Sequence, residues 1–436
     1  MFNKKTRILL LFSIIIIFFW GYSYLEVLKQ NKVTDATVVG HINYADSLGR
    51  QSIDLIEMLN VEDISTNFIA AGRVKKDDLS DYVLKIIRNE GTDRSVGKVM
   101  IYERVLKSDK NEIPLRFLFN SFLSWVKDFP RERQIWIAYS MIESTAIPEA
   151  WTEKINTYFD AVVVPDPFMV DVYKNSGVIK PIFVIPLSVD IQHMLDSPIK
   201  VKRNDVFTFM NLSAITSRKN HIAILKAFHK AFNNDSKVRL VINSRLFKKD
   251  SYAELKSYIK ENDITNIQIT TDTLTKQEYL DLLRTADCYI NVSRGEGFSV
   301  QPREAMALGI PVIISNNTAQ STIAKSKLVL AVAPSKSVPS YNEFLKLYLG
   351  NDFETDIEKI SLAMKEIYSN YDYYLSKSIA MRDWSKTYHY DNIKLLYHNL
   401  VKPKKLILGN KNEVTATYLE TNSKELYNKY QKNLAN

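Results

Sequence analysis

The chain has 436 residues and a mass of 50.3 kDa, which exceeds one ordinary domain and suits two domains of α/β size. Its 58 Lys and Arg residues against 49 Asp and Glu give a formal charge of +9. That excess is too small over this length for a dedicated nucleic-acid binder, and it favours anionic small ligands or a negatively charged membrane surface. The single cysteine, Cys288, excludes an intramolecular disulfide and a cysteine-rich zinc site.

The amino-terminal segment has the pattern of a membrane anchor. A basic flank at residues 1–7 precedes an uncharged run of Ile, Leu and Phe at 8–25, which can just span a bilayer as a helix. A cleaved signal peptide shares this pattern, but no Ala-x-Ala-like site follows, and Trp20 and Tyr22 favour the membrane interface. We therefore expect an uncleaved anchor, followed by a tether at 26–35.

A first series of alternating strands and helices is predicted over residues 36–190. An apolar strand at 36–40 leads into a polar loop that begins with His41, and Gly49 then precedes a helix at 51–59. Further strands are predicted at 135–139, 161–164 and 182–185, and helices at 147–158 and 169–176. Residues 191–204 read as a linker.

A second series is predicted over residues 205–375. Its strands are expected at 207–211, 238–242, 267–270, 288–292 and 311–314, with helices near 219–233, 251–262, 276–285 and 302–308. Beyond 340 the pattern turns helical, and 401–436 is a polar tail. Alternation with nearly continuous apolar strands predicts parallel sheets covered on both faces. The fold class is therefore α/β, with two Rossmann-like domains that face a central cleft at the carboxyl ends of their strands.

The most informative stretch, residues 293–312, follows an apolar strand and leads into a helix. Gly295 and Gly297 permit a tight turn and a close approach of the backbone to a ligand, and Pro302 suits a first helical turn whose N–H groups can bind an anion. Glu296 and Glu304 lie eight positions apart. Two acids beside a phosphate site indicate a ligand with hydroxyl groups, because carboxylates accept paired hydroxyl hydrogen bonds.

The pattern Glu-x7-Glu within Gly-Glu-Gly-Phe-Ser and Pro-x-Glu-Ala-Met-Ala-x-Gly-x-Pro-Val resembles the signature of the group 1 glycosyltransferases, retaining enzymes of the GT-B fold. The resemblance implies that Glu304 holds the ribose hydroxyls of a nucleotide sugar and that Glu296 contacts the donor sugar. It also implies that the amides of Gly297, Phe298 and Ser299 face the sugar and phosphates.

A second signal lies at residues 211–221, between a strand and a helix. Arg218 and Lys219 carry the charge needed to donate hydrogen bonds to a diphosphate and to neutralise a departing nucleotide. Such a pair at a helix start is often simply solvated. Family members resemble this segment, with basic residues here that grip the donor diphosphate. Relatives often carry a further Arg five or six positions earlier, where this chain has Leu, Ser and Ala at 212–214.

The N-terminal half resembles the same family in several short segments, among them 142–151 and 159–168. Many members place a His near the end of the strand at 135–139. Here Glu143 follows that strand, and it is a candidate for contact with the acceptor or the donor sugar. His41 and Gly49 lie where acceptors usually bind, although His41 is equally typical of a solvated loop. Residues 376–400 resemble the late crossover helix that returns to the first domain.

The resemblance implies a membrane-anchored retaining transferase that moves a hexose from a nucleotide-diphosphate sugar to a glycan, lipid or other hydroxyl acceptor. The catalytic residues are expected to be Glu296, Lys219 and Arg218. No metal is expected, because no Asp-x-Asp signature lies at a suitable strand end and the histidines lack metal-ligand spacing. The nucleotide sugar is a co-substrate rather than a cofactor.

Two other functions compete with this reading. The first is a nucleotide-sugar epimerase of the same fold, for which a membrane anchor is unexpected. The second is a non-catalytic, glycosyltransferase-like binding partner in a membrane complex. This alternative stays open because the chain lacks a His and an Arg that many family members carry.

The side of the membrane is set by flanking charge. Three basic residues precede the apolar run and two follow it closely, which favours a cytosolic N-terminus. That orientation suits a Golgi or endoplasmic-reticulum lumen in a eukaryote, whereas in a bacterium nucleotide sugars are found only at the cytoplasmic face.

Overall fold

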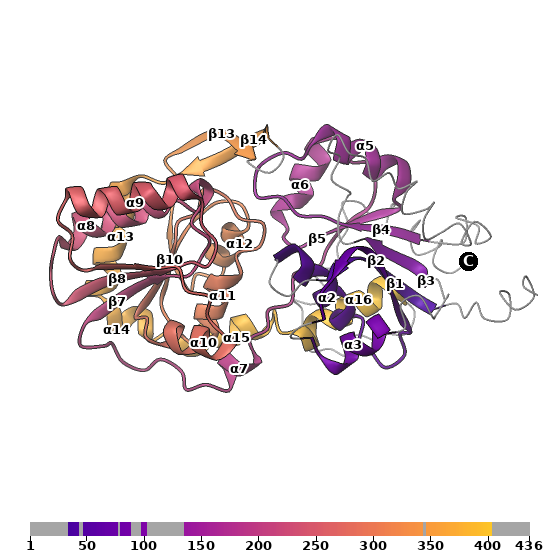
Figure 1. The fold of residues 1–436 in the computed structure, drawn as a ribbon, viewed down its shortest axis with the longest axis horizontal. Helices are drawn as coiled ribbons and strands as arrows, with labels where there is room; N and C mark the ends of the chain where they lie inside the picture. The colour runs from indigo at the N-terminus through magenta and orange to yellow at the C-terminus, as the bar shows by residue number, and fades with distance from the viewer. Residues whose placement is uncertain are drawn as a thin grey trace, which may run out of the picture.

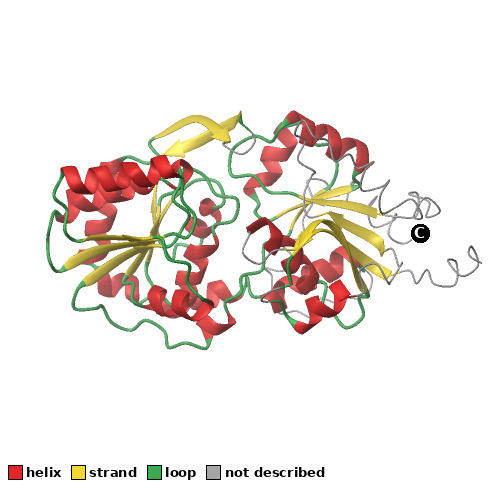
Figure 2. Ribbon diagram, viewed as in Figure 1, coloured by secondary structure: helices red, strands yellow, loops and turns green. Residues whose placement is uncertain are grey.

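The computed structural model describes residues 34–42, 47–76, 79–88, 97–102, 135–342 and 346–402 (Figures 1 and 2). The predicted basic flank, the apolar run at 8–25, nearly all of the tether and the tail beyond 402 lie outside these residues. Within the described ranges, no helix is both long enough and apolar enough to cross a bilayer. The described residues form two α/β domains with a two-stranded hairpin between them (Figure 1).

The N-terminal domain holds a six-stranded parallel sheet of order β2-β1-β3-β4-β5-β6. Strands β4 to β6 are buried at every residue, because helices cover both faces. The chain leaves β1 towards β2 and then returns to the other side of β1, which makes the sheet doubly wound. The strands are β1 (Thr34–Ile42), β2 (Thr66–Val74), β3 (Gly97–Tyr102), β4 (Ile135–Tyr139), β5 (Ala161–Val164) and β6 (Ile182–Val184), and the helices α2 (Ser47–Met58), α3 (Asp81–Arg88), α5 (Glu149–Tyr158) and α6 (Phe168–Asn175).

The C-terminal domain repeats this plan with a parallel sheet of order β12-β11-β10-β7-β8-β9. Its switch point, where the winding direction reverses, lies between the neighbouring strands β7 and β10. The strands are β7 (Phe207–Asn211), β8 (Val238–Asn243), β9 (Ile267–Thr270), β10 (Cys288–Asn291), β11 (Val312–Ser315) and β12 (Leu330–Val332). The helices are α7 (Gln192–Leu195), the 3₁₀ turn η3 (Ser217–Lys219), α8 (His221–Phe232), α9 (Lys249–Glu261), α10 (Lys276–Arg284), α11 (Val300–Ala307), α12 (Gln320–Lys325), α13 (Ile357–Ser369) and α14 (Tyr371–Leu375).

The expectation of helix beyond 340 is wrong at its start. Residues there form an antiparallel hairpin of β13 (Lys336–Asn342) and β14 (Leu347–Glu354). Pro339 disfavours a helix at this point, and the first helix after the hairpin begins at 357 with Asp356 as its N-cap. The hairpin extends from the C-terminal domain to the N-terminal one (Figure 1). Its Leu349 is buried in the N-terminal core cluster that contains Ile142 and Ile147.

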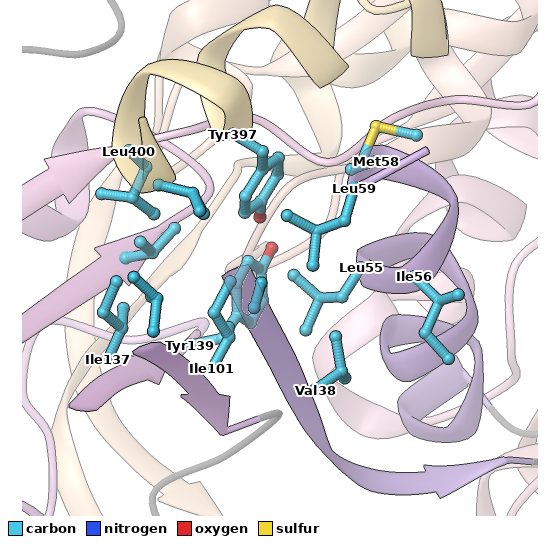
Figure 3. Packing of buried hydrophobic residues seen from close by; sticks show 14 of the residues in the cluster. Val38, Leu55, Ile56, Met58, Leu59, Ile101, Ile137, Tyr139, Tyr397 and Leu400 are labelled. Atoms are coloured by element: carbon cyan, nitrogen blue, oxygen red, sulfur yellow. The ribbon is translucent and has the colours of Figure 1, made fainter. Parts of the chain in front are cut away.

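The segment predicted as one crossover helix at 376–400 consists of two, α15 (Ser378–Lys386) and α16 (Tyr390–Val401). Helix α15 stays with the C-terminal domain, where it packs against α11. Helix α16 belongs to the N-terminal core: Tyr397 and Leu400 pack there with Leu55 of α2 and Tyr139 of β4 (Figure 3). The chain therefore passes between the domains twice.

Candidate functional site

The candidate site lies at the switch point of the C-terminal sheet. Arg218 and Lys219 follow β7 in the turn η3, and Glu296 follows β10. Since β7 and β10 are hydrogen-bonded neighbours, the loops after them are adjacent, although Arg218 and Glu296 lie 78 positions apart in the chain. Ligands of doubly wound sheets bind outside the carboxyl ends of strands at such a point. The structure thus brings the two sequence motifs together.

Glu296 is the centre of a charge cluster. Its Oε1 accepts a hydrogen bond from Lys219 Nζ at 2.5 Å, and its Oε2 lies 3.4 Å from Arg218 Nη1. Arg218 also donates to the carbonyl of Gly295, at 2.5 Å. Its other terminal nitrogen, Nη2, lies 3.5 Å from Glu143 Oε1 of the N-terminal domain. Arg218 therefore joins carboxylates from both domains.

Burial and charge oppose each other in this cluster. Burial acts to raise the pKa of Glu296, but the neighbouring Lys219 and Arg218 outweigh it, so the pKa of this carboxyl is lowered. Burial also lowers the pKa of the Lys219 ammonium, an effect that Glu296 opposes. Both groups are largely shielded from bulk water, with Lys219 9% and Glu296 4% exposed. An anion that enters the site must therefore compete with Glu296 for two cations that are already paired.

The loop that carries Glu296 is held by hydrogen bonds from the next loop along the sheet. The Glu296 N–H donates to Thr318 Oγ1 at 2.8 Å, and Gln320 Nε2 donates to Ser299 Oγ at 3.2 Å. Ser299 adopts a left-handed φ of 64° as the residue that precedes α11. This conformation is uncommon outside glycine and fixes the direction in which the loop enters the helix.

Sequence reasoning missed Arg303, which lies inside the Glu-x7-Glu motif and is fully buried. Its guanidinium lies over the Phe298 ring at 3.9 Å and the Tyr388 ring at 4.5 Å, and it donates to the carbonyls of Phe298 and Ser299. Its Nη2 is 3.7 Å from Asp166 of the N-terminal domain. Arg303 therefore holds the main chain of the Glu296 loop in position.

Gly295 and Gly297 both lie against the N-terminal domain, while the close approach to a ligand that the sequence predicts for them stays a prediction. Neither residue is among the glycines with a positive φ; Gly295 lies against the backbone of the N-terminal domain and Gly297 against its Met141 side chain. A Cβ placed on Gly295 would lie 2.1 Å from the carbonyl oxygen of Glu143, and one on Gly297 would lie 2.5 Å from Met141 Cγ. These glycines therefore permit the domains to meet beside the charge cluster.

Glu304 lies on α11, one helix turn or more from the Glu296 loop, and is half-buried. Its Oε2 accepts a hydrogen bond from the hydroxyl of Tyr279 on α10 at 2.6 Å. The ribose role that the resemblance implies for Glu304 stays a prediction.

The candidates in the N-terminal domain lie in three places. Glu143 contacts Arg218, as described above. His41 is not in a loop, because β1 extends to Ile42; it is half-buried near the end of that strand. Gly49 lies in the first turn of α2, and the residues between, 43–46, are outside those described. The acceptor roles of His41 and Gly49 stay predictions.

The segment at 211–221, which lacks the further Arg that relatives often carry, is held by hydrogen bonds between neutral side chains. His221 begins α8, and its Nε2 lies 3.0 Å from Asn211 Oδ1 and 3.3 Å from Ser213 Oγ. Burial, followed by the nearby charge of Lys219, lowers the pKa of His221 to about 3, so the imidazole is neutral. The described residues contain no group of three or more His, Cys, Asp or Glu that could hold a metal ion.

Comparison with protein families agrees with the resemblance. Residues 195–360 match the family model described as glycosyl transferases group 1. The matched region contains Arg218, Lys219, Glu296 and Glu304. A protein of Sulfolobus islandicus rod-shaped virus 1, named "Uncharacterized protein 356", is 20% identical over 334 residues, which cover 72% of this chain and 93% of the viral protein.

Solved glycosyltransferase structures share the whole fold. HepE from Anabaena in complex with UDP has a TM-score of 0.58 at 10% identity, covering 84% of this chain and 99% of HepE. A glycosyltransferase from Rickettsia africae has a TM-score of 0.58 at 16% identity, covering 86% and 99%. WaaG, a glycosyltransferase involved in lipopolysaccharide biosynthesis, has a TM-score of 0.56 at 9% identity, covering 84% and 99%. The α/β GT-B fold predicted from the sequence is thereby confirmed.

Proposed function

We propose that the chain is a glycosyltransferase that transfers a hexose from a nucleotide-diphosphate sugar to a hydroxyl group with retention of configuration. The observation that carries the proposal is the meeting of Arg218, Lys219 and Glu296 within 3.5 Å at the switch point of the C-terminal sheet. The family match over 195–360 includes all three residues. HepE, which shares the fold, has been solved with UDP and with UDP-glucose, which supports a nucleotide sugar as the ligand class.

The chemistry follows from the charges of the site. When the glycosidic bond to the diphosphate breaks, negative charge develops on the leaving phosphate oxygens. Arg218 and Lys219 follow β7 at the switch point, and they exchange part of their pairing with Glu296 for contacts with the diphosphate. Glu296 is then freed to accept hydrogen bonds from hydroxyls of the transferred sugar. In this mechanism the donor's own phosphate receives the proton of the acceptor hydroxyl.

The N-terminal domain supplies the acceptor side. Its Glu143 already reaches Arg218, and His41 and Gly49 lie near the switch point of the N-terminal sheet, between β1 and β3. We propose that this edge binds the acceptor, a glycan or a lipid. Approach of the two domains excludes water from the reacting groups, as the buried Glu296 illustrates.

The anchor, the location and the absence of a metal requirement also remain proposals. The uncharged run at 8–25 supports a single membrane-spanning segment that tethers the enzyme to a bilayer. Extraction of membranes at alkaline pH tests it: the full chain is expected to stay in the pellet, and a chain that starts at residue 30 to be released. Protease protection of sealed vesicles then reports the side on which the domains lie.

Activity is tested by incubating the purified chain with UDP-, GDP-, ADP- and dTDP-hexoses, with and without EDTA, and by measuring release of the nucleoside diphosphate. We expect release from one donor, unaffected by EDTA and lost in Lys219→Ala and Glu296→Gln. Interconversion of the sugar without release would instead indicate an epimerase. No turnover or binding with any donor would favour a non-catalytic partner. Once an acceptor is found, NMR of the anomeric proton distinguishes retention from inversion.

A further inference from the structure

The hairpin that bridges the domains places an additional carboxylate at the site. Asp352 of β14 is 8% exposed, and its Oδ1 would lie 3.4 Å from a Cβ built on Gly295, the residue before Glu296. The charges of Arg218, Arg294 and Glu143 all act on it. Asp352 therefore belongs to the surroundings of the charge cluster, although it lies 56 positions beyond Glu296 in the sequence, outside every motif that the sequence presented.

The two oxygens of the Asp352 carboxylate differ in their hydrogen bonding. Ser340 on the opposite hairpin strand hydrogen-bonds to the Asp352 side chain, but Oδ1 has no hydrogen-bond partner among the described residues. A buried, unpaired carboxylate oxygen costs free energy, and such atoms are usually completed by a water, an ion or a ligand. Burial accordingly raises the pKa of Asp352, despite the nearby arginines. This unpaired oxygen is enclosed by the protein and faces the Gly295 backbone.

The anchoring of the hairpin fixes where Asp352 lies. Leu349 is buried in the N-terminal core, and the Asn351 N–H donates to Thr145 Oγ1 at 2.8 Å. Gly350 has a φ of 57°, and a Cβ there would lie 2.5 Å from Thr145 Oγ1, so glycine is needed on both counts. Beyond Asp352, the N–H of Phe353 donates to the Arg294 carbonyl of the C-terminal domain. Asp352 is thus held between anchors on both domains.

We propose that Asp352 is a sugar-binding residue, whose unpaired carboxyl oxygen accepts a hydrogen bond from a hydroxyl of the hexose in the bound donor. This inference rests on the proposed function. A phosphate is excluded as the partner, because a carboxylate repels it. The donor sugar is favoured over the acceptor, because Asp352 packs beside the loop of Glu296, which the glycosyltransferase resemblance places against that sugar. The hairpin thereby contributes to donor selection.

The test compares the affinity of each variant for a nucleoside diphosphate and for the matching nucleotide sugar by isothermal titration calorimetry, with UDP and UDP-glucose as the first pair and the other bases if these do not bind. We expect Asp352→Ala to weaken binding of the nucleotide sugar about 10-fold, the effect of one hydrogen bond to a charged group. The affinity for the nucleoside diphosphate is expected to stay within about twofold of wild type, because this ligand lacks the hexose that would contact Asp352. Asp352→Asn keeps the shape and an acceptor oxygen and should fall between.

The matched control is Glu354→Gln, two residues along the same strand, where the carboxylate is already paired with Lys336 and Arg294. It should leave both affinities unchanged. Equal affinity of wild type and Asp352→Ala for the nucleotide sugar would overturn the role of Asp352. So would an equal loss for both ligands, or a change confined to the KM of the acceptor. A wild-type chain that binds no nucleotide sugar would overturn the proposed function, and the inference with it.

Discussion

Substitution of Gly295 by alanine tests whether contact between the domains is part of the active arrangement. The new Cβ would lie 2.1 Å from the carbonyl oxygen of Glu143 and 3.3 Å from its carbonyl carbon. Non-bonded atoms do not approach to 2.1 Å, and a backbone carbonyl cannot rotate away as a side chain does. The loop at 295 and the segment at 143 must therefore separate, and the 3.5 Å contact of Arg218 with Glu143 lengthens with them.

The magnitude follows from the cost of overpacking, about 1–3 kcal/mol for an added methyl group in a well-packed contact. If that cost falls on the closed arrangement, its population relative to an open one falls about 5- to 150-fold. We expect kcat/KM to fall by about 10- to 100-fold on the same basis. The unfolding free energy of the C-terminal domain should change little, because Gly295 is not among the glycines with a positive φ that alanine would strain.

Gly297→Ala provides the matched comparison. Its Cβ would lie 2.5 Å and 2.6 Å from Cγ and Sδ of Met141, a flexible side chain that can adopt another rotamer. We expect a loss of at most about threefold, because the methionine yields where the carbonyl cannot. Donor-dependent release of nucleoside diphosphate measures both variants, and small-angle X-ray scattering with donor present reports the degree of closure. Full activity in Gly295→Ala, or an equal loss in both, would refute the reasoning.

Three further predictions concern stability. Glu296→Gln leaves the buried Lys219 ammonium without its counter-charge and should lower the free energy of unfolding in urea by about 3 kcal/mol, with Lys219→Met in the same chain restoring at least half; a loss that the double variant repeats in full would contradict this. Burial raises the pKa of Asp166 to about 6 in the folded chain, so its contribution to stability is present below pH 4 and is lost as pH rises through 6, by up to about 3 kcal/mol. Unfolding in urea from pH 4 to 7 should therefore show a smaller decrease in the free energy of unfolding for Asp166→Asn than for wild type. Parallel curves of this free energy against pH would refute the assignment. Leu349→Ala should cost about 2–3 kcal/mol of hairpin docking and speed proteolytic cleavage between β13 and β14, whereas unchanged cleavage would show that docking does not depend on this side chain.

Regular elements with strong local patterns were predictable. Strands β4, β5, β7 and β9 begin and end where the apolar runs do, and the loop after β10 is where glycines and acids gather. Strands β4, β5 and β7 lie inside their parallel sheets, where burial on both faces favours apolar residues, whereas β9 is a partly buried edge strand. The hydrophobic pattern therefore carries most of the information on the two sheets.

The remaining features depend on contacts between residues far apart in the chain. Strands β2 and β3 were not predicted: β2 contains small and polar residues, with Gly72 and Arg73 near its end, and only pairing with β1 makes it a strand. Arg303 is buried by Phe298, Tyr388 and Asp166, and Asp352 lies beside Gly295 through the hairpin, so both positions depend on residues far apart in the chain. No local spacing encodes these contacts.

The two passages of the chain between the domains lie side by side, and the N–H of Val189 donates to the carbonyl of Tyr388 at 2.8 Å. The C-terminal domain therefore begins and ends at one point, as a domain inserted into the N-terminal one. The core of the N-terminal domain lacks α16 until nearly 400 residues have been synthesised, whereas the inserted domain is complete about a dozen residues earlier. During synthesis the second domain is thus able to fold first, reversing the usual order of N-terminal before C-terminal folding.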